Sequence, residues 1–181
     1  MTRPFRAGVL ALFTLIAVAC GSVAQHSASM PPATFSDYDA AFCGAFTSLI
    51  RAYGNPDTNA PSAMRKALDD SVAAGDRAAA DVASTAMLNE LEAGRRLAAT
   101  AARWQPGAAT AGHLDRLLVA FEAWTTAKRD RASDPAALDP QTAFERAGGV
   151  DAWTATIQGV STTPIPAGAS PAPCRAFQGE V

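Results

Sequence analysis

Positive charge and histidine are scarce in this sequence of 181 residues. Charged residues make up 18% of the chain, histidine occurs twice, and the formal net charge is -2. A nucleic-acid-binding protein needs a basic surface to displace counterions from phosphates. The acidic isoelectric point, about 5.6, therefore argues against that class of protein.

Aromatic residues and runs of β-branched residues are also few. The chain has two Tyr and three Trp, against forty-three Ala. Alanine has the highest helix propensity of all residues and is a poor strand former. The composition therefore predicts an all-α fold of one domain, and argues against a sandwich, a barrel or a doubly wound sheet.

Sequence motifs for catalysis and cofactor binding are missing. The chain contains no Gly-x-x-x-x-Gly-Lys, Gly-x-Ser-x-Gly, His-Glu-x-x-His, Gly-x-Gly-x-x-Gly or Cys-x-x-Cys-His pattern. A zinc site needs three or four converging ligands, and the two histidines are His26 and His113, the latter expected to be a solvated residue in the first turn of a helix. Asp69 and Asp70 are neighbours whose side chains would point about 100° apart on a helix. We therefore predict no catalytic residue, no metal ligand and no cofactor.

The N-terminus has the pattern of an export signal. Arg3 and Arg6 precede an apolar stretch at residues 7–17, which is shorter than the ~20 residues of a membrane-spanning helix. The next residues, Ala17-Val18-Ala19-Cys20, resemble the lipobox of bacterial lipoproteins, although Leu is usual where Ala17 stands. The resemblance implies a signal peptide at 1–19 and an acylated Cys20 as the first mature residue. An ordinary secretory cleavage at the same place, or a cut after Ser22-Val23-Ala24, is the alternative.

The cysteine count bears on the cleavage site, because lipidation of Cys20 and a cut after Ala24 both leave two cysteines, whereas cleavage before Cys20 without lipid leaves an odd thiol. If Cys20 carries lipid, Cys43 and Cys174 remain, in a setting that permits disulfides. A bond between them closes a loop of about 130 residues, which contributes roughly 4 to 5 kcal/mol in the chain-entropy model. Cleavage also removes Arg3 and Arg6, which leaves 13 basic against 17 acidic residues and a charge of -4. Membrane attachment would therefore depend on the acyl chains.

The mature chain divides into a tether, a helical region and a tail. Residues 20–34 are rich in Ser, Ala and Pro and predict a flexible tether, whereas 161–181 is Pro-rich and predicts an extended tail tied back through Cys174. Between them, 35–160 predicts a four-helix-type bundle. The first three expected helices run from Ser36 or Asp37 to Tyr53, from Ser62 to Trp104, and from Thr110 to the charged run 128–131. The last helical element begins at Asp139-Pro140. It is expected to bend or break at Gly148-Gly149, with Asp151 as the cap of the part that follows.

The segment from Ser62 to Trp104 contains no proline, and we favour one long helix over two helices broken near Gly75-Asp76. Its residues at steps of three and four predict a contact seam, listed here in order: Met64, Leu68, Val72, Gly75, Ala79, Val82, Ala86, Glu90, Ala93, Leu97, Ala101 and Trp104. Met87, Leu88 and Leu91 fall off this seam. Glu90 falls on it, and because burying an unpaired carboxylate is costly, we expect either that Glu90 pairs with Arg95, Arg96 or an arginine of another helix, or that the seam changes face there.

Two functions fit this organisation. The first is a membrane-anchored exported lipoprotein of the cell envelope, facing the extracytoplasmic side and serving as a non-catalytic interaction or structural module; without lipidation it would be secreted. The second is a carrier that binds a lipid, an isoprenoid or haem between its helices, in a pocket lined by Trp104, Phe121, Trp124, Trp153 and Glu90. Core packing is the alternative role of these aromatic residues. A carrier needs an internal apolar cavity of roughly 300 Å³ or more, whereas an exposed apolar patch favours a protein partner.

Overall fold

The computed structural model describes residues 33–55 and 60–169, and within them the fold is all-α, as predicted. The elements, in chain order, are α1 (Phe35–Tyr53), β1 (Gly54–Asn55), β2 (Ala60–Pro61), α2 (Ala63–Ala73), α3 (Arg77–Ala101), a 3-10 turn η1 (Gln105–Gly107), α4 (Ala108–Asp130), α5 (Pro140–Arg146) and α6 (Gly149–Thr162). The two short strands pair antiparallel. The signal peptide, Cys20, most of the tether and Cys174 lie outside the described residues, so the predictions about them stay predictions.

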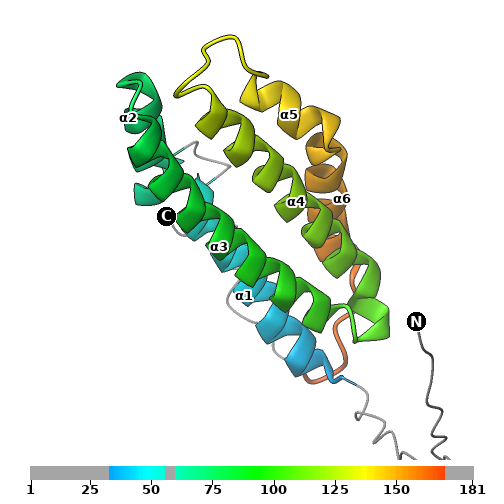
Figure 1. Cartoon of the computed structure of the whole chain (residues 1–181). Helices are drawn as coiled ribbons and strands as arrows, with labels where there is room; N and C mark the ends of the chain where they lie inside the picture. Colours follow the sequence, from blue (N-terminus) through cyan, green and yellow to red (C-terminus); the bar gives the residue numbers. More distant parts are fainter. Residues whose placement is uncertain (1–32, 56–59, 170–181) are drawn as a thin grey trace, which may run out of the picture. The chain divides into compact units, whose positions relative to one another are not determined.

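The helices pack as a bundle with α4 at its centre. In Figure 1, α1, α3 and α4 lie side by side with alternating chain direction, and α5 and α6 follow one another along the other side of α4. Along the whole of α4, only Ala109 and Arg116 are exposed. The stripe predicted from Leu114 to Trp124 is buried, and it forms the middle of the core together with α1.

Helix α1 packs on the predicted face. Tyr38, Phe42 and Leu49 are buried, while Phe35, Phe46 and Tyr53 are partly buried against the same cluster. Its start differs from the prediction, because Thr34 caps the helix in place of Ser36 or Asp37. The Asp37 amide donates to Thr34 Oγ1 (3.2 Å), and Asp37 Oδ2 accepts from the Thr34 amide (2.9 Å). This reciprocal capping box satisfies two amides that helix geometry leaves without partners.

The prediction of one long helix between Ser62 and Trp104 is wrong. Gly75 adopts φ +66°, a left-handed conformation that ends α2, and the Asp76 side chain then accepts from the Ala79 amide to cap α3. Ser62, near which the helix was expected to begin, caps α2, since its hydroxyl accepts from the Arg65 amide. The break makes α2 a short separate helix that packs against α3.

The predicted seam of α3 is one residue out of register. The buried residues step by four and three along α3: Ala80, Ser84, Met87, Leu91, Gly94, Ala98 and Ala101. Val82 and Ala86, which were placed on the seam, are exposed, whereas Met87 and Leu91, which were placed off it, belong to the core. The alternation of three and four matches left-handed bundle packing.

The last two helices follow their sequence signals closely. Asp139 caps α5 through the Thr142 amide (3.1 Å), with Pro140 as its first residue. Gly148 has φ +77° and separates α5 from α6, so the chain breaks at the predicted glycine pair. Gly148 itself is the cap of α6, and Asp151, the expected cap, lies in the first turn of that helix.

Candidate functional site

The aromatic residues proposed to line one internal pocket lie in separate places. Trp104 packs against Phe35 and Tyr38 of α1, with ring centres 5.3 and 4.9 Å away. Trp153 of α6 stacks on Phe46 of α1 at 6.5 Å. Both tryptophans therefore serve as contacts between α1 and other elements.

Phe121 and Trp124 do come together, around Tyr53. Their ring centres lie 4.3 and 5.2 Å from the Tyr53 ring. The Arg65 guanidinium of α2 lies over the same tyrosine ring at 4.2 Å, and over Trp124 at 5.5 Å. Burial raises the pKa of Tyr53. This cluster attaches α2 to α1 and α4 through cation-π contacts.

Glu90 pairs with an arginine of another helix, as expected. Its Oε1 lies 3.9 Å from Nη1 of Arg51 on α1, and its side chain is 22% exposed. The pairing places Glu90 at the edge of the α1–α3 interface. It does not bring Glu90 near Phe121, Trp124 or Trp153 in any contact that the structure records.

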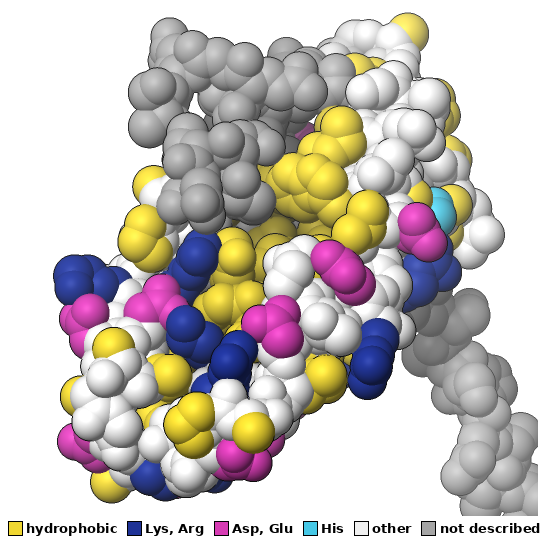
Figure 2. Space-filling model, turned by 90° about the horizontal axis from the view of Figure 1, so that it is seen from above, with side chains coloured by type: hydrophobic (Ala, Val, Ile, Leu, Met, Phe, Trp, Pro, Cys, Tyr) yellow, Lys and Arg dark blue, Asp and Glu magenta, His cyan; other side chains and the backbone are white. Residues whose placement is uncertain are grey.

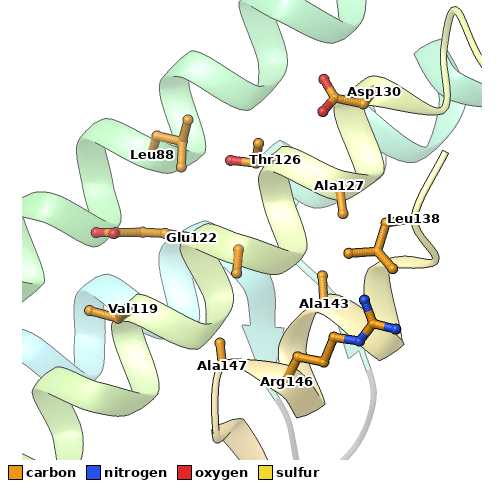
Figure 3. Close-up of a pocket in the computed structure, with 11 residues that line it drawn as sticks. Leu88, Val119, Glu122, Thr126, Ala127, Asp130, Leu138, Ala143, Arg146 and Ala147 are labelled. Atoms are coloured by element: carbon orange, nitrogen blue, oxygen red, sulfur yellow. The ribbon is translucent and has the colours of Figure 1, made fainter.

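A groove with a volume of about 720 Å³ runs along α4, away from the aromatic clusters. Its floor is a stripe of α4: Val119, Glu122, Ala123, Thr126, Ala127 and Asp130. Leu88 of α3 forms one wall. The other wall comes from Leu138 in the connection before α5 and from Ala143, Arg146 and Ala147 on and just after α5. Figure 3 shows Leu88 and Leu138 on opposite sides of the α4 floor.

The lining of the groove is mainly apolar and small, and the groove is open to the surface. Leu138 is 44% exposed at its edge. Ala123 and Thr126 are half-buried, although they lie on the side of α4 that no other helix covers. An open apolar groove of this kind differs from the enclosed cavity that a carrier needs.

The acidic groups of the groove are already paired. Glu122 Oε2 lies 3.4 Å from Arg95 Nη1, and Asp130 Oδ1 lies 2.8 Å from Arg129 and 3.5 Å from Arg77. Arg146, in contrast, makes no ion pair within residues 33–55 and 60–169. Among the described residues, the groove therefore carries one positive charge, that of Arg146, without an ion-pair partner.

One face of the described molecule has mixed charge. Figure 2 shows basic and acidic side chains interspersed around exposed hydrophobic ones on the face seen from above. Arg95 joins α3 to α4 through Asp115 at 3.0 Å, and the hydrogen bond to Asp115 is the main cause that raises the pKa of Arg95. Such a surface has no single-sign field to attract a polyanion.

His113 and the acidic residues do not form a metal site in the part of the chain that is described. No group of three or more His, Cys, Asp or Glu side chains converges there. His113 Nδ1 contacts the Arg116 guanidinium, and burial, followed by that positive charge, lowers the pKa of His113. His113 is half-buried in α4, where we expected a solvated residue. Among the described helices, none is both long and apolar enough to cross a membrane.

The groove residues were not predicted from the sequence. One signal was present, because Leu88 stood off the predicted seam and Val119, Ala123, Thr126 and Asp130 recur at steps of three and four. The spacing shows that these α4 residues share a face, but it does not show that α3 and α5 stand on either side of that face.

The comparison with known proteins gives no family: no protein-family model, no characterised protein and no solved structure is detectably similar to the chain. The class that the structure defines is thus an all-α helical bundle, in which the core is filled by side chains and a groove lies open on the central helix.

Proposed function

We propose that this protein is an exported lipoprotein whose helical domain is a non-catalytic interaction module of the cell envelope. Arg3, Arg6, the apolar stretch 7–17 and the lipobox-like Ala17–Cys20 support export and acylation. Because α1 begins at Phe35, about fourteen residues separate Cys20 from the helical domain. A segment of that length would hold the domain clear of the lipid headgroups.

The groove on α4 is the observation that carries the interaction role. It is open, mainly apolar and bounded by Leu88 and Leu138 from two different elements. The core beside it is filled, since Leu114, Leu117 and Leu118 have no exposed area. A filled core with an open apolar groove favours a macromolecular partner over a small hydrophobic ligand held between the helices.

A disulfide between Cys43 and Cys174 is part of the proposal. Cys43 is half-buried on α1, one turn before Phe46, which packs on Trp153 of α6. The described chain continues to Ala169, five residues before Cys174. Export supports the bond, since oxidising compartments retain disulfides. The bond would tie the tail to the first helix of the bundle.

Mass spectrometry of the protein extracted from membranes tests the anchor. We expect a mature N-terminus at Cys20 that carries a diacylglyceryl group, and Cys20→Ala should release the protein from the membrane fraction. An unmodified N-terminus at Cys20, or a mature chain that starts at Gln25, would show that the protein is secreted without an anchor.

Site-specific photo-cross-linking in intact cells tests the interaction role. A benzoylphenylalanine at Leu138, on the edge of the groove, should give a discrete adduct, and the same probe at Val82, which is 74% exposed on α3, serves as the matched control. Failure of every surface position to give an adduct would refute the interaction role.

A further inference from the structure

We infer that the groove on α4 binds an amphipathic α-helix of a partner protein, with an acidic side chain of that helix placed against Arg146. The inference rests on the proposed interaction role and names its site and the chemistry of the partner. Three properties of the groove support it: its shape, the size of its lining residues and its charge.

The shape of the groove fits a helix. The floor is a single helical stripe from Val119 to Asp130, which spans about 16 Å at 1.5 Å per residue. Leu88 and Leu138 stand on either side, so the surface is concave along the axis of α4 (Figure 3). A second copy of the same groove is also concave and cannot fill it. A partner helix presents the convex ridge that can.

The lining residues are small where a helix would come closest. Ala123, which is half-buried, and Ala147, which is exposed, project only a methyl group, which allows two helix axes to approach to about 8 Å. Leu88 and Leu138 supply larger apolar contacts at the two sides. This arrangement matches helix-in-groove recognition, in which apolar residues at steps of three and four lie between two walls.

The charge of the groove selects an acidic partner. Glu122 and Asp130 are paired with arginines of this chain, whereas Arg146 has no ion pair within the described residues. Arg146 is exposed at the C-terminal end of α5, on the wall of the groove. A carboxylate on the partner helix would neutralise it, and a basic residue at that place would be repelled.

A pair of synthetic peptides tests this inference on the full mature protein, purified with its anchor. Both are stapled helices of about 18 residues, or roughly 27 Å, with Leu and Ala on one face. They differ only in one residue at the edge of that face, Glu in one peptide and Lys in the other. Fluorescence polarisation under one fixed detergent condition measures binding to the wild type and to each variant.

We expect the Glu peptide to bind the wild type about tenfold more tightly than the Lys peptide, because the first gains and the second opposes one partly exposed ion pair. Arg146→Glu should reverse that preference. Arg116→Glu makes the same change of charge on an exposed part of α4 away from the groove and should leave the preference unchanged. Ala123→Phe fills the groove and should weaken both peptides, whereas Ala78→Phe on exposed α3 should weaken neither.

Circular dichroism first establishes that each variant is folded, and Ala147→Phe replaces Ala123→Phe if the latter is not. Equal binding of the two peptides, or binding that Arg146→Glu and the filled groove leave unchanged, would overturn the inference. So would self-association that Ala123→Phe abolishes, since a second copy would then occupy the groove. Cross-links from Leu138 without peptide binding would reject the helix and leave the interaction role standing, whereas loss of all cross-links would reject that role itself.

Discussion

Gly94 of α3 lies where one added side chain would meet both α1 and α4. A Cβ atom built at Gly94 of α3 lies 3.0 Å from Ser48 Cβ, 3.2 Å from the Ala45 carbonyl oxygen and 3.3 Å from Leu118 Cδ1. The Ala45 oxygen belongs to the backbone of α1 and cannot rotate away. We therefore expect Gly94→Val to force α1 and α3 apart.

The change in the free energy of unfolding caused by Gly94→Val follows from two opposing effects. Overpacking a filled core costs about 1–3 kcal/mol, and valine exceeds alanine by two methyl groups that must also fit between α1 and α4. Replacing a helical glycine returns only about 0.5 kcal/mol. The net loss should be about 2 kcal/mol, which for a domain of this size lowers Tm by about 4–8 °C.

Gly112→Ala is the matched control. Gly112 lies within α4, and a Cβ built there meets no atom within 4 Å. The substitution keeps the gain in helix propensity without a clash, so the free energy of unfolding should rise by about 0.5–1 kcal/mol. Urea unfolding followed by circular dichroism measures both variants. If Gly94→Val unfolds at the same urea concentration as the wild type, or if both variants shift in one direction, the close packing of α3 on α1 is not as the structure has it.

Three further predictions concern charge and redox state. Arg95→Met should lower the free energy of unfolding by less than about 1 kcal/mol, because the side chain of Arg95 in its ion pairs is 38% exposed. Urea unfolding should show that this loss becomes smaller in high salt. A larger loss that does not depend on salt would contradict the prediction. NMR titration should give His113 a pKa below its ordinary 6.5, and Arg116→Gln should raise that pKa. As the pH falls, the unfolded chain takes up a proton on His113 before the folded chain does. The contribution of His113 to the free energy of unfolding is therefore complete above about pH 6.5 and falls as the pH drops through the folded pKa. Alkylation of the oxidised mature protein under denaturing conditions should label neither Cys43 nor Cys174, and two labelled cysteines would exclude the disulfide.

Elements with strong contrasts between neighbouring residues could be predicted from the sequence. The stripe from Leu114 to Trp124 places large apolar residues at steps of three and four, and these residues are buried. Asp139-Pro140 combines a capping side chain with a residue that favours the first helical position, and α5 begins there. In both cases the sequence offers one clearly favoured arrangement: one buried stripe in α4 and one starting residue for α5.

The seam of α3 could not be read in the same way because alanine occurs in both candidate registers. Ala79 and Ala80 are adjacent, as are Leu97 and Ala98, so a stripe can pass through either member of each pair. The left-handed turn at Gly75 then resets the helical phase, and a register carried over from α2 becomes wrong by one residue. The large residues Met87 and Leu91 were the better guide, since their burial removes more apolar surface from water.

The proposed aromatic pocket fails for a different reason, which is distance along a helix. Trp104 precedes α4 and Trp124 lies near its far end, and the sixteen helical steps from Ala108 to Trp124 span about 24 Å. Residues that share one face can therefore lie at opposite ends of the bundle. A pocket also needs walls, and walls depend on which helices become neighbours, a property that periodicity within one helix does not contain.

The residues that line the groove bear on function because the packing of the core does not account for all of them. The buried residues of α4 pack chiefly against α3 and α6, and Ala123 and Thr126 belong to neither core cluster. Long polar side chains at these positions would cover the floor and raise solubility, as they do on other exposed helices. Instead the floor between α3 and α5 is left open beside an arginine without an ion pair among the described residues. Small floor residues and an unneutralised charge on the wall would both serve the approach of another helix.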